Sequence, residues 1–390
     1  MLAGALTVSP VAASPGQDPS TAVAGGKAAS INYPNLQKVS CPTASFCMAV
    51  GDQTIGSAFA STKRVLVERW DGSRWSLSPT PAVAGKSLSL SGVSCVSTTS
   101  CVAVGTVYSK ATGTKPLAER WNGTSWSISS ALSPTSATYA ELVAIRCVST
   151  TRCFAVGSFT RSNVTRMLIE YWNGSTWKIG TSPNLSGKGP SYLYAVACAN
   201  QRFCYAVGSY RSANGLQRTL TLKWNSAQWS VVASPNPTGS SEDPQLVGVS
   251  CPTSSCMAVG LYSVPGSLPT DDIYKTLTER WNGSQWTIVA SPNGSRFGDG
   301  FLSGVFCTSP LACIAVGGAG GQTLAERWDG RTWTVLPSPN PASDFVGLSS
   351  VSCAGSTCFA VGGYGEASVH KTLIERFDGS RWAIQPSPNP

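Results

Sequence analysis

The chain of 390 residues consists largely of one unit that occurs seven times in degenerate form. Its recurring letters are V-x-C, a gap of four or five residues, C-x-A-V-G, a variable segment, L-x-E-R-W-[D/N]-G-x-x-W and S-P-N-P. Successive first cysteines are 54, 52, 51, 53, 56 and 46 residues apart. A period near 50 residues with internal strand signals is typical of propellers and other closed arrays, so the repeat constrains the fold more than length does.

Four short strands are predicted in each unit, and the last unit shows them well. There the first strand ends at Val351–Cys353, the second runs over Cys358–Gly362, the third over Thr372–Phe377, and the fourth begins at Trp382. Asp378-Gly379 predicts a type I′ hairpin turn, since both residues tolerate positive φ. The same signal recurs as Asp71-Gly72, Asn122-Gly123, Asn173-Gly174, Asn282-Gly283 and Asp329-Gly330.

A sheet of four short strands cannot bury both of its faces alone, whereas seven such sheets packed around a ring can. We therefore predict an all-β fold over residues 36–390, a seven-bladed β-propeller with four antiparallel strands per blade. The ring could close without strand exchange, or Ala28–Pro34 could add a strand to the last blade. Residues 1–35 are predicted to be a signal-peptide remnant that lacks a basic n-region, followed by a linker.

Parts of the last unit resemble the kelch repeat, namely the diglycine in FAVGGY, the aromatic-Asp pair in ERFDG, and a spaced tryptophan before a proline-rich exit. The diglycine occurs only as Gly317-Gly318 and Gly362-Gly363, and the other five units have a single glycine there. DGxxW is also similar to the Asp-box of sialidase-like propellers, which places one more residue between Asp and Gly. The kelch resemblance would suggest copper oxidase chemistry, but His370 is the chain's one histidine, which excludes multi-histidine metal sites.

All 14 cysteines fall into seven local pairs that bracket the turn between the first two strands. The pairs are Cys41 with Cys47, Cys95 with Cys101, Cys147 with Cys153, Cys198 with Cys204, Cys251 with Cys256, Cys307 with Cys313, and Cys353 with Cys358. Opposed residues of a tight hairpin come within bonding distance, so we predict seven disulfides, worth about 2 kcal/mol each. Reduced thiols are one alternative, and zinc is another, although pairs spaced one per blade would lie far apart.

Seven disulfides require an oxidising compartment, so we expect a secreted protein, extracellular or at the cell surface. No apolar run reaches 18 residues, and we therefore expect no transmembrane span.

With strands A to D in antiparallel order, the A to B and C to D turns lie on one side of the ring. We name this side the disulfide face, and the opposite side, with the B to C and D to A connections, the variable face. We expect loops as B to C connections, from Gly318–Gln322 in unit six to Leu261–Lys275 in unit five. Ligand sites concentrate on variable loops held by a rigid scaffold, so we expect any site on the variable face.

A basic residue stands two positions before the strand C leucine in six units, and Gln322 takes its place in unit six. The six are Arg64, Lys115, Arg166, Arg218, Lys275 and Lys371. Strand alternation places them on the same face as the motif glutamate, so a local ion pair of little energetic value is one interpretation. Alternatively, within a net charge of +9, they form a positive collar suited to an anionic polymer.

Aromatic residues follow the strand B glycine at Phe159, Tyr210, Tyr262 and Tyr364. They could be half-exposed packing residues, or they could stack on sugar rings. The 13 tryptophans, by contrast, occupy two fixed places per unit, which indicates packing.

Five acids gather around unit five, at Glu242, Asp243, Asp271, Asp272 and Asp299. Two of them could hold Ca²⁺, the one cofactor that we consider, or act as acid and base on a glycoside. If the chain is an enzyme, the candidate catalytic residues are Asp271, Asp272, Glu242 and Asp299, with Tyr262 or Tyr274. Solvated loop charge is the alternative.

The leading hypothesis is a monomeric, non-enzymatic recognition propeller that binds an anionic extracellular polysaccharide or cell-wall polymer. One alternative is a glycoside hydrolase or polysaccharide lyase that uses carboxylates near blade 5. Another is a structural or protein-binding propeller at a cell surface. We expect no specific nucleic-acid partner.

Overall fold

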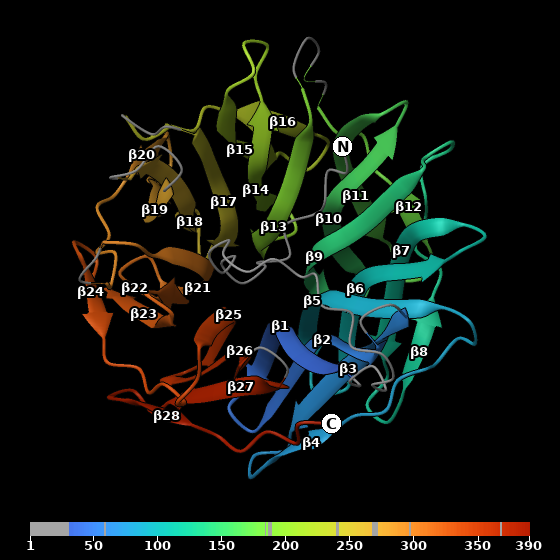
Figure 1. Ribbon diagram of the computed structural model, residues 1–390. Coiled ribbons are helices and arrows are strands. Elements are labelled where there is room, and N and C mark those ends of the chain that lie inside the picture. The colour runs from blue at the N-terminus through green and yellow to red at the C-terminus, as the bar shows by residue number, and fades with distance from the viewer. Residues whose placement is uncertain are drawn as a thin grey trace, which may run out of the picture.

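The computed structural model describes residues 31–57, 60–183, 185, 189–238, 242–266, 272–295, 298–366 and 369–390. These residues form 28 strands in seven four-stranded antiparallel sheets, and none of them is helical. The sheets follow one another around a single axis in chain order, from blue to red in Figure 1. The predicted seven-bladed β-propeller is therefore confirmed. Across the described part of the chain, no helix is long and apolar enough to span a membrane.

In every blade the A strand lies nearest the axis and the D strand at the rim (Figure 1). The A strands are β1 (Ile31–Thr43), β5 (Ser87–Ser97), β9 (Tyr139–Ser149), β13 (Ser191–Asn200), β17 (Glu242–Ser250), β21 (Phe301–Ser309) and β25 (Phe345–Ala354). The B strands are β2 (Phe46–Ser57), β6 (Ser100–Ser109), β10 (Arg152–Arg161), β14 (Phe203–Arg211), β18 (Cys256–Pro265), β22 (Ala312–Ala319) and β26 (Thr357–Glu366).

The C strands end at the first aromatic of the repeat, and the short D strands begin at the second. The C strands are β3 (Ala60–Trp70), β7 (Gly113–Trp121), β11 (Val164–Trp172), β15 (Gln217–Trp224), β19 (Asp272–Trp281), β23 (Gln322–Trp328) and β27 (Val369–Phe377). The D strands are β4 (Trp75–Leu77), β8 (Trp126–Ser129), β12 (Trp177–Ile179), β16 (Trp229–Val232), β20 (Trp286–Ile288), β24 (Trp333–Leu336) and β28 (Trp382–Ile384).

The B to C segments that we expected to be loops are mostly paired strand, so that expectation was wrong. β2 pairs with β3 as far as Ser57 opposite Ala60, and β18 pairs with β19 as far as Pro265 opposite Asp272. These extensions project beyond the packed part of the blade and carry polar residues on both faces, which hides the alternation that marks a half-buried strand. The variable face is therefore built from extended hairpins, whose side chains have fixed register.

The ring closes without strand exchange. Ile31–Pro34 belongs to β1, where it pairs with Gln53–Gly56 of the same blade rather than adding a strand to blade 7. Blade 1 meets blade 7 through side chains, as Phe359 packs against Trp70 and Trp75 with ring centroids 5.1 and 5.3 Å apart.

The core lies between neighbouring blades rather than within one. Each apolar cluster combines residues of two blades, and the first and second aromatics of all seven C to D hairpins are at most 6% exposed. This confirms the packing role predicted for tryptophan. The glycine of A-V-G is fixed by close approach of strand A, since a Cβ on Gly157 would lie 2.1 Å from the carbonyl oxygen of Glu141.

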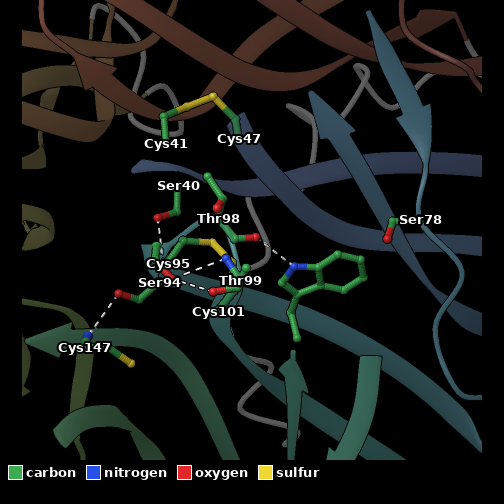
Figure 2. Close-up of a disulfide and its surroundings, with 12 residues drawn as sticks. Ser40, Cys41, Cys47, Ser78, Ser94, Cys95, Thr98, Thr99, Cys101 and Cys147 are labelled. Carbon is green, nitrogen blue, oxygen red and sulfur yellow. Dashed lines mark hydrogen bonds between the residues drawn. A yellow bond between two sulfur atoms is a disulfide. The ribbon is translucent and has the colours of Figure 1, made fainter. Parts of the chain in front are cut away.

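All seven predicted disulfides are present, with Cα atoms 3.9 to 4.2 Å apart, and no free cysteine occurs among the described residues. In blades 1, 2, 5 and 7 the residue before the first cysteine is a serine, and its hydroxyl accepts a hydrogen bond from the amide of the first cysteine in the next blade. In Figure 2, Ser40 Oγ accepts a hydrogen bond from the Cys95 amide and Ser94 Oγ accepts one from the Cys147 amide, at 3.0 and 2.9 Å. At four of the seven interfaces the disulfide face is thus linked between blades as well as within each blade.

The C to D turns differ from the type I′ prediction. Four residues separate Trp70 from its partner Trp75, and Asp71 Oδ1 accepts hydrogen bonds from the amides of Ser73 and Arg74 at 2.8 and 2.9 Å. In these turns only the second residue has positive φ, as at Gly72 with 99°, and in blade 4 this residue is Ser226 with 81°. The Asp or Asn therefore acts through its side chain, as in an Asx turn, rather than through its own backbone conformation.

Candidate functional site

The aromatic and basic residues flagged on the variable face are cross-strand partners in four blades. The pairs are Phe159 with Arg166, Tyr210 with Arg218, Tyr262 with Lys275, and Tyr364 with Lys371. Directly opposed residues of an antiparallel pair place their side chains on the same face, with Cβ atoms about 5 Å apart. Two features that are separate in the sequence thus form one repeated aromatic–basic pair.

The six basic residues differ in their solvent exposure and in their hydrogen bonds. Arg64, Arg166 and Lys371 are exposed, whereas Arg218 is half-buried. Lys115 Nζ donates to the carbonyl of Ala137 at 2.9 Å, and Lys275 Nζ donates to that of Gly298. These two lysines therefore hold the connection to the next blade in addition to presenting charge. Arg64 lies opposite Gln53 and Lys115 opposite Val107, so neither has an aromatic partner.

The aromatic members are half-buried. Phe159, Tyr210, Tyr262 and Tyr364 each pack against an apolar cluster shared with the preceding blade. Packing holds each ring in place while part of its surface remains exposed, which is the arrangement a stacking platform needs.

The local ion pair with the motif glutamate is absent from the described residues, whose three ion pairs join Lys63 to Asp52, Arg74 to Asp71 and Arg381 to Asp378. The glutamates are instead fully buried, at Glu68, Glu119, Glu170, Glu279, Glu326 and Glu375. In four blades the carboxylate accepts a hydrogen bond from the serine of S-P-N-P in the preceding blade, for example from Ser234 Oγ to Glu279 at 2.8 Å.

Burial raises the pKa of these glutamates, to about 8 at Glu279 and to about 7 at the other five. The serine hydroxyl opposes the shift where it is present, as at Glu326. The asparagine of the same S-P-N-P turns back onto its own blade, where Asn236 Oδ1 accepts from the Thr219 amide at 3.0 Å. The serine of S-P-N-P and the motif glutamate therefore link neighbouring blades, while the asparagine fixes the turn on its own blade. These are structural roles.

The residue after the glutamate faces the other neighbouring blade, as strand alternation requires. The guanidinium of Arg120 lies 4.5 Å from the ring centroid of Trp172, and in blade 4, where Leu222 replaces the glutamate, Lys223 Nζ lies 5.3 Å from the ring centroid of Trp281. Glu-Arg-Trp is thus an interface motif whose glutamate accepts a hydrogen bond from the preceding blade in four blades and whose basic residue contacts the following blade.

Among the residues that the structure describes, the acids around blade 5 form neither a catalytic pair nor a metal site. Asp299 Oδ2 accepts a hydrogen bond from the Gly320 amide at 3.2 Å and so holds the blade 6 hairpin, and Asp272 is exposed at the start of β19. Asp271 and the side chain of Glu242 lie outside the described residues. Within the described ranges no three His, Cys, Asp or Glu side chains gather closely enough to hold a metal ion, so Ca²⁺ binding stays a prediction.

One polar cluster was missed in the sequence. Glu141 on β9 is 9% exposed and accepts hydrogen bonds from Tyr139 Oη at 2.7 Å and from Ser158 Oγ at 2.9 Å. Tyr192 and Tyr194 on the neighbouring β13 have nearly parallel rings, with centroids 6.1 Å apart and planes at 5°. Burial and the electrostatic effects of Tyr192 and Glu141 raise the pKa of Tyr194 to about 12.

This cluster lies at the variable-face ends of the A strands of blades 3 and 4, since Tyr139 pairs with Thr160 and Tyr192 with Ser209. A signal for it exists in the sequence, because Glu141 is the only acid outside the repeated motif between residues 121 and 241. We name Tyr139, Glu141, Tyr192 and Tyr194 the tyrosine cluster.

The chain matches no known protein family and no curated protein. Among solved structures it resembles "YCF48 bound to D1 peptide", with a TM-score of 0.51 and 14% identity over 91% of this chain and 96% of that one. It also resembles a polysaccharide lyase, "PL25-Ulvanlyase bound to -[GlcA(1-4)Rha3S]-", with a TM-score of 0.51 and 10% identity over 92% and 93%. At these identities the similarity shows the propeller fold alone, and the kelch relationship stays a prediction.

Proposed function

We propose that the chain is a secreted binding propeller that recognises an anionic extracellular polysaccharide through its variable face. The observation that carries this proposal is the aromatic–basic cross-strand pair in blades 3, 4, 5 and 7. An acidic sugar presents an apolar ring face and a charged group within one residue, and a ring beside a guanidinium or ammonium complements both. The seven disulfides support an oxidising, extracellular location.

Propellers of this shape accept more than one class of ligand. The two similar structures were solved with a peptide and with a uronate-containing glycan. The regularly placed aromatic–basic pairs favour the glycan, because they recur along the face as sugar residues recur along a polymer. The hydrolase or lyase alternative would need carboxylates near blade 5, of which Asp299 already holds a backbone amide.

The test is binding of the oxidised protein to immobilised uronate, sulfated and phosphate polymers, and to neutral dextran, at low and high salt. We expect binding to the acidic polymers that weakens as salt rises, because exposed charges are screened. The double variant Phe159→Ala with Arg166→Gln should bind more weakly. Lys178→Gln is the matched control, because it removes one exposed charge from the rim strand β12. Binding that salt does not affect, or no binding to any acidic polymer, would contradict the proposal.

A further inference from the structure

The positive charge of the chain is concentrated in two blades. Residues 121–241, which contain blades 3 and 4, hold ten Lys and Arg residues and two glutamates, a net charge of +8 within +9 for the whole chain. Both glutamates, Glu141 and Glu170, are buried. The positive charge that could attract an anionic polymer is therefore concentrated in one sector of the ring. The repeat instead predicts a collar spread evenly around it.

Four arginines bring this charge to the variable face. Arg161 and Arg166 lie on the blade 3 hairpin, and Arg211 and Arg218 lie on the blade 4 hairpin, with no acid in residues 158–166 or 209–218. None of the ion pairs among the described residues involves them. In blade 1, by contrast, the hairpin lysine Lys63 is neutralised by Asp52 at 3.2 Å.

The blade 3 hairpin already shows an arginine on an aromatic ring. The Arg161 guanidinium lies 5.7 Å from the ring centroid of Phe159, and the cross-strand partner of Phe159 is Arg166. Arg166 donates to the carbonyl of Arg161 at 3.2 Å. Each guanidinium has five N–H donors in a fork that matches a carboxylate or sulfate, so donors remain for an external anion.

Toward the axis, the same two blades carry the tyrosine cluster. Tyr139, Tyr192 and Tyr194 are half-buried, and the hydrogen bond from Tyr139 to Glu141 fixes the orientation of the first ring. This cluster is not part of the repeat, because the positions equivalent to Glu141 in the other blades are Asn35, Ser89, Tyr192, Gln245, Phe301 and Gly347. A buried carboxylate found in one blade only is not needed to hold a blade together.

We propose that blades 3 and 4 form the binding site for the acidic polysaccharide, with the tyrosine cluster stacking on pyranose rings and Arg161, Arg166, Arg211 and Arg218 pairing with the carboxylate or sulfate groups. This inference rests on the proposed function and assigns it a place on the ring. Tyrosine rings provide the apolar contact, and the arginines provide bidentate recognition of the acid. Glu141 is a positioning residue that acts through Tyr139.

A matched control for charge uses exposed basic residues outside the aromatic–basic pairs. Arg166→Gln with Arg218→Gln removes two charges from the hairpins of blades 3 and 4, and Arg64→Gln with Lys178→Gln removes two charges, one from blade 1 and one from the rim strand β12. With polygalacturonate and dextran sulfate as probes, we expect the Kd to rise by about tenfold or more for the first variant and by less than about threefold for the second. Equal losses would overturn the blade 3 and 4 site while leaving the proposed function in place.

The tyrosine cluster is tested separately. Tyr192→Ala should raise the Kd for polygalacturonate by about tenfold, whereas Tyr192→Phe should leave it within about twofold, because the ring and not the hydroxyl makes the contact. Thermal unfolding of both variants verifies that they fold. Unchanged affinity in a folded Tyr192→Ala protein would exclude the tyrosine cluster. If the unaltered protein binds neither probe, the proposed function fails as well.

Discussion

The two faces of the ring differ in how many of their structural features recur from blade to blade. On the disulfide face nearly every blade has the same devices, namely a disulfide, an Asx turn and a tryptophan whose indole donates to the A to B turn, as Trp121 does to Thr98 at 3.1 Å. On the variable face the hairpins differ in length, and their charge changes from four arginines in blades 3 and 4 to two aspartates in blade 5. The repeated features hold the ring, and the unrepeated ones are the candidates for recognition.

Reduction of the seven disulfides should have the largest effect. Each closes a loop of five or six residues, which corresponds to about 2 kcal/mol in the chain-entropy estimate. We expect the fully reduced protein to have a much lower Tm, measured by circular dichroism with alkylated thiols. An unchanged Tm would mean that the blade interfaces alone hold the ring, and that the repeated disulfides are not stabilising.

Glu279→Gln should alter the pH dependence of stability. The raised pKa means that the folded protein keeps protons that the unfolded chain loses above about pH 4.5. All six buried glutamates contribute to this effect. The free energy of unfolding therefore falls as pH rises from about 5 to 8. Glu279→Gln should gain on the order of 2 kcal/mol at pH 8 and little at pH 4, measured by urea unfolding. Glu366→Gln, at an exposed position, is the control, and equal shifts in both variants would contradict the prediction.

Ser387→Ala tests whether ring closure differs from the other interfaces. Ser387 Oγ donates to Glu68 across the closure at 2.9 Å, and Ser291 Oγ donates to Glu326 between blades 5 and 6 at 2.7 Å. Since no strand is exchanged, we expect Ser387→Ala and Ser291→Ala to cost similar amounts, about 1 to 2 kcal/mol each, in urea unfolding. A cost at Ser387 more than twice that at Ser291 would show that stability depends more on this bond at the closure than at the interface of blades 5 and 6.

Ser226→Gly should have the smallest effect, and it should be stabilising. Ser226 occupies the turn position that is glycine in the other six blades, and its φ is 81°. A side chain in this region is strained, so glycine should add about 0.5 to 1 kcal/mol to the free energy of unfolding. Ser226→Ala, which keeps a Cβ, is the control and should give no gain in Tm.

The sequence was sufficient for the fold because the signal that decides it recurs seven times. The period, the cysteine pairs and the tryptophan positions each predicted a feature that the structure confirms. The interface role of the glutamates was not predictable locally, since Ser234 stands 45 residues before Glu279 and belongs to another blade. Strand alternation instead suggested the nearby basic residue.

The candidate site was predicted in parts and not as a whole. The face, Phe159, Tyr210, Arg166 and Arg218 were all flagged, but their cross-strand pairing depends on the register of hairpins that resemble loops in sequence. The tyrosine cluster could be assembled only in space, because its residues come from two blades and match no motif.

Closure without strand exchange has a consequence for how such a chain can change. Every blade is encoded by one uninterrupted stretch, and the two ends of the ring touch, with Asn32 Nδ2 donating to the Pro390 carbonyl at 2.9 Å. In-frame duplication or deletion of one period therefore adds or removes one whole blade and leaves every other sheet intact. The same geometry allows circular permutation, with 390 joined to 31 and new ends opened at any D to A connection. The ring has no obligatory first blade.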